Sequence, residues 1–318
     1  MPAIRRDCCA LGGFEGFHLS LAVIILTFNE SRHIARAIDS VAAIASDIVV
    51  VDSGSIDDTV TIAAARGARV LTHPFVNQAQ QFQWALDHAG IETDWVMRLD
   101  ADEVIEPDLA QEISTRLPDL PAEVTGVTLD RKHVFMGKWI RHGGRYPLTL
   151  LRIWRRGKAK IENRWMDEHI YLLEGRSIGF AGGFADINLN DLTFFTEKHN
   201  RYATREAVEV LNQRHGLFAA DERTLGDLPQ ARRKRALKEK VYNRLPFGVG
   251  PALYFIFRYV FQLGFLDGVE GAIYHGLQGF WYRALVDAKI VELERQIRDL
   301  PTPAEKLDRL RGLTGLSL

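Results

Sequence analysis

Three carboxylates within four residues, Asp100, Asp102 and Glu103, follow directly after the apolar run Trp95–Leu99. Such a run is typical of a buried strand, so these side chains are expected at the carboxyl end of that strand. Two carboxylates that flank one small residue, Ala101, can share a divalent cation. Oxygen ligands suit Mg²⁺ or Mn²⁺, and both ions also bind phosphate oxygens. The alternative for this motif is a solvated acidic turn.

Polar residues also follow two earlier strands. The apolar runs Leu21–Leu26 and Ile48–Asp52 are typical of central strands in a parallel sheet. Helical periodicity follows them at residues 32–43, between Asp57 and Gly67, and again at 79–89. This alternation predicts an α/β fold with a doubly wound, mainly parallel sheet, in which ligands bind at the carboxyl ends of strands. Three polar strand ends are therefore expected to meet in one crevice. A solvated acidic turn after one strand would not predict this convergence.

The composition places further limits on the fold and its chemistry. With 318 residues, 47% hydrophobic and 25% charged, the chain has the make-up of a globular protein. It has no G-x-G-x-x-G after the first strand and no G-x-x-x-x-G-K-[ST], which argues against a dinucleotide dehydrogenase or a P-loop enzyme. The adjacent pair Cys8-Cys9 cannot form a disulfide framework, so a cytoplasmic location is expected. Residues 1–17 are interpreted as a loose leader.

The last third of the chain is basic and aromatic. Between Pro229 and Val260, eight Lys and Arg residues face Glu239 alone, although the whole chain has a net charge of −1. In the aromatic run Phe247–Phe261, glycines, a proline and Arg258 interrupt any transmembrane span. A helix in the membrane interface, with bases near anionic head groups, is predicted instead. The alternative is a helical subdomain that buries its aromatics against the predicted α/β domain or another subunit, which would give an oligomer.

Three blocks, taken together, resemble glycosyltransferase family 2, which has the GT-A fold. They occur in the order and spacing of that family and are Val23–Glu30, Val49–Thr59 and Leu99–Glu103. Within the family, the chain is most similar to bacterial enzymes that build lipopolysaccharide cores and exopolysaccharides. That closer similarity extends through Lys138–Pro147, Trp165–Ile170 and Phe194–Ala207.

The resemblance implies roles for the strand-end residues. Asp52 would hydrogen-bond the nucleobase; as an alternative, its carboxylate caps a turn. The other donor-pocket residues implied are Thr27, Asn29, Glu30 and Ser53. Asp100 would contact the ribose or a metal-bound water, Asp102 would bind the metal directly, and Glu103 would hold the loop. The cation neutralises the departing diphosphate.

One position departs from the family pattern. Many relatives carry a basic residue shortly before an Asn-x-Ala-Leu in the third helix. The corresponding stretch here is Gln81–Leu86, and Phe82 occupies the position expected for the base. Diphosphate contacts are therefore expected elsewhere, from Gln80, Gln81, Arg98 or Arg145.

A second carboxylate centre lies at Trp165–Ile170. Inversion at the anomeric carbon needs a base that takes the acceptor's proton, and relatives place an acidic residue here. Glu168 is the favoured base and Asp167 the alternative, while His169 either completes the metal site or is structural. An exposed polar strand end is the alternative for the whole block.

These observations predict a GT-A catalytic domain over 18–215 and a helical, aromatic-rich extension over 216–318. The predicted function is inverting, Mg²⁺- or Mn²⁺-dependent transfer from a nucleotide-diphospho-sugar donor to a saccharide or lipid-linked acceptor, in cell-envelope polysaccharide synthesis. The expected location is cytoplasmic, with peripheral attachment to the cytosolic face of the inner membrane, and no nucleic-acid partner is expected. A nucleotidyltransferase, or an inactive saccharide-binding or scaffold protein of a polysaccharide assembly complex, remains as an alternative.

Overall fold

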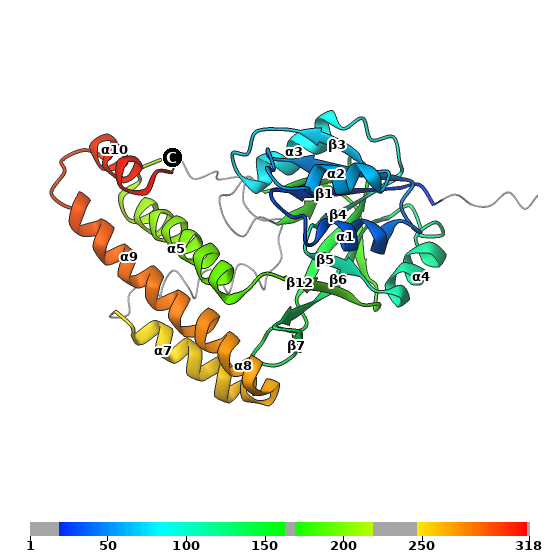
Figure 1. Ribbon diagram of the computed structural model, residues 1–318. Coiled ribbons are helices and arrows are strands. Elements are labelled where there is room, and N and C mark those ends of the chain that lie inside the picture. The colour runs from blue at the N-terminus through cyan, green and yellow to red at the C-terminus, as the bar shows by residue number, and fades with distance from the viewer. Residues whose placement is uncertain (1–18, 163–168, 219–246, 317–318) are drawn as a thin grey trace, which may run out of the picture.

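The computed structural model describes residues 19–162, 169–218 and 247–316, and every structural statement below concerns these residues. An α/β part comes first in the chain, and a group of helices follows (Figure 1). The first strands and helices alternate as predicted: β1 Leu21–Thr27, α1 Ile34–Val41, β2 Asp47–Asp52, α2 Thr59–Ala65, β3 Arg69–Thr72, α3 Gln78–His88 and β4 Trp95–Asp100. The remaining elements of the α/β part are β5 Glu103–Ile105, α4 Pro107–Arg116, β6 Val124–Phe135, β7 Lys138–Ile140, β8 Thr149–Arg155, β9 Ala159–Ile161, β10 Ile170–Leu172, β11 Arg176–Gly179 and β12 Phe184–Ile187.

The main sheet has the strand order β3-β2-β1-β4-β8-β6-β12-β5, and β7 and β11 also pair with β6. Its first four strands are parallel, whereas β8 runs antiparallel to both neighbours. A parallel sheet needs helices on its faces. Side chains of α1, α2 and α4 share one apolar cluster with the sheet, and side chains of α3 share a second cluster with it. The predicted doubly wound, mainly parallel sheet is confirmed.

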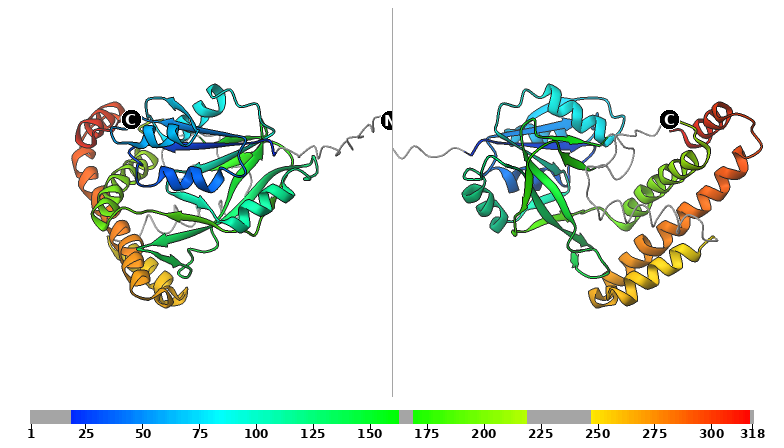
Figure 2. Two further views of the ribbon diagram at one scale, coloured as in Figure 1. Left: turned by 45° about the vertical axis from the view of Figure 1, so that its right-hand side comes forward. Right: turned by 180° about the vertical axis from the view of Figure 1, so that it is seen from behind.

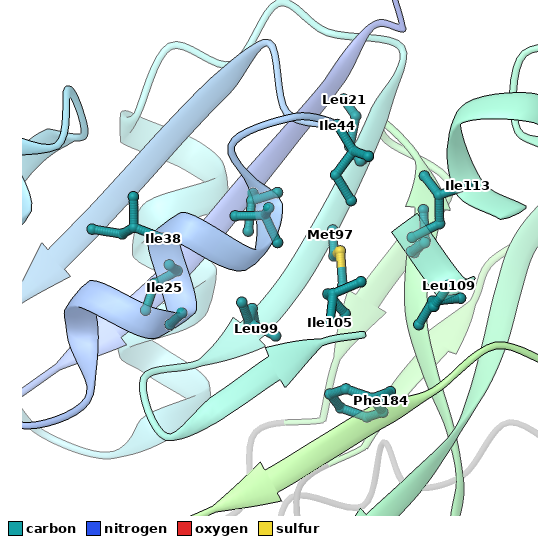
Figure 3. Packing of buried hydrophobic residues seen from close by; sticks show 14 of the residues in the cluster. Leu21, Ile25, Ile38, Ile44, Met97, Leu99, Ile105, Leu109, Ile113 and Phe184 are labelled. Atoms are coloured by element: carbon teal, nitrogen blue, oxygen red, sulfur yellow. The ribbon is translucent and has the colours of Figure 1, made fainter. Parts of the chain in front are cut away.

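The larger cluster fixes where the strand ends lie. Met97 and Leu99 on β4 pack with Ile25 on β1 and with Ile38 on α1, all of them buried (Figure 3). Ile105 on β5 and Leu109 on α4 extend the same cluster beyond β4. The acidic turn after β4 is therefore held at both ends by strands whose side chains are in the core.

The second part of the structure is helical. It contains α5 Leu192–His215, α7 Val249–Ile256, the π-helix η2 Phe257–Phe261, the 3₁₀-helix η3 Gly264–Asp267, α8 Gly268–Tyr274, the π-helix η4 His275–Trp281, α9 Tyr282–Ile297 and α10 Pro303–Thr314. One apolar cluster joins α5, α9 and α10, and these helices lie to one side of the sheet (Figure 2). By its packing, α5 belongs with the later helices, although the domain boundaries themselves stay predictions.

Among the described helices, none alone is long and apolar enough to cross a membrane. The segments Val249–Phe261 and Gly264–Ile297 together have the length and hydropathy of a membrane segment, and they are bent by 71° at their junction. The basic cluster of the sequence, residues 232–240, lies outside the described residues.

Candidate active site

Three polar strand ends lie side by side in the sheet. Thr27 at the end of β1 is in register with Asp52 at the end of β2. On the other side of β1, Leu26 is in register with Asp100 at the end of β4. Because the three strands are parallel neighbours, the loops after them leave the same edge of the sheet. The predicted convergence of the three strand ends is confirmed.

Asp52 organises the loop that follows β2. It is 2% exposed, and its Oδ2 accepts hydrogen bonds from the backbone N–H groups of Gly54 and Ser55 at 2.9 and 2.8 Å. The hydroxyls of Ser55 and Thr27 donate to Oδ1 at 2.5 and 3.2 Å. A carboxylate has about four lone-pair sites, and these four donors use them. The contacts are those of the turn-capping alternative, and the nucleobase role stays a prediction.

The other donor-pocket candidates form a connected rim. Asn29, at a positive φ of 55°, accepts a hydrogen bond from the backbone N–H of Ile56 at its Oδ1. The carboxylate of Glu30 lies 2.6 Å from Nδ1 of His33. Since Nε2 of His33 accepts a hydrogen bond from the backbone N–H of Leu189, Nδ1 carries the proton that is donated to Glu30.

Gln81 contacts the residues that follow β2 and β3. It is 1% exposed; its amide N–H donates to Oγ of Ser53 at 3.1 Å, and its Oε1 lies 2.7 Å from Nδ1 of His73. Phe82, where a base was expected by analogy, is fully buried in the core against Trp154. Gln81 is thus occupied by protein partners, and its predicted contact with the diphosphate stays a prediction.

Asp100 and Glu103 are tied to arginines. Oδ1 of Asp100 accepts a hydrogen bond from Nε of Arg98 at 3.1 Å, and Oδ2 accepts one from Arg152 at 3.3 Å. Burial alone would raise the pKa of Asp100, but these arginines hold it well below its usual range. Glu103 accepts hydrogen bonds from Arg152 and from the backbone N–H of Asp100, at 2.6 and 2.9 Å. These contacts are those expected of a residue that holds the loop.

Asp102 has the opposite environment. Its Oδ2 accepts a hydrogen bond from Asn188 at 3.0 Å. Burial, together with the negative charges of Asp186, Asp100 and Glu30, raises the pKa of Asp102 to about 6, and nearby Lys198 opposes this shift. Burial is the largest cause of this shift, and a cation bound at Asp102 would offset both the burial of its charge and the repulsion from the neighbouring carboxylates.

Sequence reasoning missed three residues around Asp102: Asp186, Asn188 and Lys198. Asp186 accepts a hydrogen bond from His133 at 3.1 Å; burial would raise its pKa, but His133, Arg131 and Lys198 lower it to about 2. Lys198 lies on α5, where burial lowers its pKa but Tyr202 and the carboxylates of Asp102, Glu30 and Asp186 outweigh burial and raise it. Asp186 lies inside the short strand β12, one residue before its end at Ile187, so it lacks the strand-end position that marked Asp52 and Asp100 in the sequence.

The donor set fits Mg²⁺ or Mn²⁺ at Asp102. Within the described ranges, no group of three or more His, Cys, Asp or Glu side chains could hold a metal ion by itself. Mg²⁺ is commonly bound through one or two carboxylates plus substrate phosphates, so a protein site with fewer ligands is sufficient. Asp102 is hydrogen-bonded to the neutral amide of Asn188, whereas Asp100 forms ion pairs with Arg98 and Arg152. Asp102 is therefore the better candidate ligand of the two.

A loop from the sheet carries Arg145 to a site near Asp186. The guanidinium of Arg145 lies 5.3 Å from the ring centre of Tyr274, and its charge helps to lower the pKa of His133, the partner of Asp186. Nε of Arg145 is buried with no hydrogen-bond partner in the part of the chain that the structure describes. Arg145 as a whole is half-buried, and a guanidinium with an unused donor suits a phosphate oxygen.

The candidate base lies outside the described residues, since Asp167 and Glu168 belong to 163–168. The next residue, His169, is described: its Nδ1 lies 3.5 Å from Glu162, and its carbonyl accepts a hydrogen bond from the backbone N–H of Glu162. These contacts fit the structural alternative for His169, and its role as a metal ligand stays a prediction.

Comparison with known proteins places this geometry in a family. The sequence model described as Glycosyl transferase family 2 matches residues 22–181, which is half of the chain. The chain belongs to glycosyl transferase family 2. The matched range runs from β1 to the turn before β12, so it contains all three converging strand ends. The predicted GT-A sheet with a helical C-terminal extension is confirmed.

Individual relatives match shorter stretches. Uncharacterized glycosyltransferases of Rickettsia conorii and Rickettsia prowazekii are each 42% identical over 93 residues, which is 29% of this chain. The chain spans about a third of the length of these curated relatives, 32% and 31% respectively. Among solved structures, glucosyl-3-phosphoglycerate synthase from Mycobacterium tuberculosis in complex with Mn²⁺, UDP and glucosyl-3-phosphoglycerate is 23% identical. That match covers 36% of this chain and 44% of the other, with a TM-score of 0.29.

Proposed function

We propose that this family 2 member is an inverting glycosyltransferase that uses a nucleotide-diphospho-sugar donor and Mg²⁺ or Mn²⁺. The observation that carries the proposal is the position of Asp102 in the turn directly after the central strand β4, where its Oδ2 accepts a hydrogen bond from Asn188 and the carboxylates of Asp186, Asp100 and Glu30 lie nearby. A divalent cation bound there would neutralise the diphosphate as it leaves. Lys198 and Arg145 add positive charge on the side of the helices.

The other steps, donor binding and proton transfer, would be carried out by side chains of the protein. Thr27, Asp52 and Ser53 shape the nucleoside end of the pocket, and Arg98 and Arg152 fix Asp100 beside it. Glu168, or else Asp167, takes the proton of the acceptor hydroxyl while its oxygen bonds to the anomeric carbon and the bond to the diphosphate breaks. The acceptor proposed is a saccharide or lipid-linked saccharide of cell-envelope polysaccharide synthesis, as the resemblance implies.

The experiment has two parts: a donor screen of the wild type and a comparison of variants. In the screen, purified protein is incubated with nucleotide sugars and Mn²⁺ and tested for release of nucleoside diphosphate, and the product configuration is determined by NMR. Glu168→Gln should lower kcat by about 10²–10⁴-fold with little change in the donor KM, since it removes only the proton acceptor. Asp167→Asn is the matched control and should retain most of the activity.

Two results would contradict the proposal. A product with retained configuration would exclude direct inversion, and full activity of both variants would remove this carboxylate pair from the chemistry. Nucleotide-sugar binding without turnover across many acceptors would favour the alternative of an inactive saccharide-binding protein.

A further inference from the structure

The segment from Phe247 to Val269 turns its apolar side chains outward. On α7 and η2 these are, at helical spacing, Val249, Leu253, Ile256, Phe257, Val260 and Phe261. On η3 and the start of α8 they are Leu263, Phe265, Leu266 and Val269. Their exposed fractions run from 40% at Val249 to 73% at Phe261. We call these ten side chains the apolar face.

The two charged residues of the same segment point the other way. Arg258 is 5% exposed; its Nε donates to the carbonyl of Gly143 at 2.5 Å and its Nη1 to the hydroxyl of Tyr254 at 3.0 Å. Asp267 is 3% exposed and accepts hydrogen bonds from the backbone N–H and the Nδ1 of His142. Surfaces in contact with water normally have the reverse arrangement, with charged side chains outward and large apolar ones inward. The segment is therefore built for an apolar neighbour.

We propose that the apolar face is a docking surface for a lipid bilayer. The bent hairpin formed by α7, η2, η3 and α8 would insert into one leaflet of the bilayer. Two further observations favour lipid over a protein partner. Protein interfaces carry a polar rim around their apolar centre, whereas Arg258 and Asp267 are withdrawn from the surface here and Glu270, the other charged residue of the hairpin, is paired with Lys138. The hairpin also belongs to a pair of segments, Val249–Phe261 and Gly264–Ile297, which together have the length and hydropathy of a membrane segment and are bent by 71°.

The charge of the neighbouring sequence fits an anionic bilayer. Seven basic residues lie between Pro229 and Pro246, directly before the hairpin in the chain, against one acidic residue. Anionic lipids attract such a segment, and apolar side chains then add their burial to the electrostatic term. The docking surface itself uses only the described residues of the hairpin.

The helical hairpin of α7, η2, η3 and α8 is also hydrogen-bonded to the loop that carries Arg145. The backbone N–H of Gly143 donates to the carbonyl of Gln262, in addition to the bonds from Arg258 and to Asp267. In Figure 1 the hairpin of β6 and β7 reaches from the sheet to α8. Docking of the hairpin would therefore bring the loop to the bilayer surface. A lipid-linked acceptor follows from this geometry, and that last step rests on the proposed function.

The test is co-sedimentation of the full chain with vesicles of phosphatidylglycerol and phosphatidylcholine, compared with vesicles of phosphatidylcholine alone. In the double variant Phe257→Ser/Phe261→Ser, two side chains that are half or more exposed lose their apolar area without gaining charge. Vesicle affinity should fall by at least about tenfold. The matched control is Leu313→Ser, because Leu313 is 41% exposed on α10, away from the hairpin. It should bind vesicles like the wild type.

Two outcomes would overturn the proposal. If the wild type does not bind vesicles, or if the double variant binds as well as the wild type, the apolar face does not dock on lipid. If the wild type forms a dimer in size-exclusion chromatography that the double variant abolishes, and no vesicle binding is seen, a second copy of the chain covers the face. Should the double variant unfold, Val269→Ser, at a 69% exposed position, replaces it. Vesicle binding is measured without nucleotide sugar, so its failure is distinguishable from failure of the proposed reaction.

Discussion

A glycine pair tests whether the Arg145 loop is docked on the C-terminal helices. Gly143 and Gly137 both have positive φ angles, 65° and 80°. A Cβ on Gly143 would overlap the ring of His275, whereas a Cβ on Gly137 would meet nothing within 4 Å. His275 is fully buried and is itself closely approached by Gly264, so its ring has no room to move. The two Gly→Ala substitutions therefore differ in packing and share the backbone cost.

The magnitudes follow from these two terms. Placing an L-residue in the left-handed region costs about 1–2 kcal/mol. Overpacking a close contact adds about 1–3 kcal/mol. Gly137→Ala should thus lower the free energy of unfolding by about 1–2 kcal/mol, and Gly143→Ala by about 2–5 kcal/mol.

Urea denaturation followed by circular dichroism measures both variants against the wild type. Contact between the loop and the helices requires a larger loss of stability for Gly143→Ala than for Gly137→Ala. Gly143→Ala should also raise the donor KM, because Arg145 lies two residues further on. Equal losses in the two variants would mean that the loop and the helices are not in contact in solution.

Two other results are expected. Burial and the charges of Arg258 and Arg145 lower the pKa of His275 to about 4, against 6.5 for an ordinary histidine. Below pH 6.5 this histidine is protonated in the unfolded chain but stays neutral in the folded chain. The free energy of unfolding should therefore fall as the pH drops from 6.5 to 4, by at most about 3 kcal/mol. In His275→Leu this part of the pH dependence should vanish; an unchanged pH profile of the unfolding free energy would refute it. Arg145→Gln should raise the donor KM roughly 10- to 100-fold through loss of a charge-assisted hydrogen bond, and an unaltered KM would remove Arg145 from donor binding.

The sheet and its converging strand ends were predictable because the signal is local. Continuous β-branched runs such as Leu21–Leu26 indicate buried parallel strands, and the residue after each run then lies at the ligand-binding edge. Glu103 could be assigned to the loop for the same reason, since its partner Asp100 is three residues away.

The remainder of the site depends on partners far apart in the chain. Asn188 contacts Asp102 across 86 residues, and Lys198 reaches the same carboxylate from a helix whose sequence indicates only local ion pairs. Arg258 was predicted near lipid head groups, but it is turned inward because its partner, the carbonyl of Gly143, lies 115 residues earlier. Spacing alone cannot reveal such pairs, whose geometry is set by the packing of the helices on the sheet.

The most direct test of the account is metal-dependent donor binding by wild type and Asp102→Asn, followed by thermal shift. Nucleotide sugar with Mn²⁺ should raise the Tm of the wild type, and chelation should abolish the rise, because ligand binding stabilises only the folded state. Asp102→Asn should fold normally but show no Mn²⁺-dependent rise, since it replaces the carboxylate proposed to bind the cation. An equal rise in Tm in wild type and variant, or one that persists without divalent metal, would contradict the central claim.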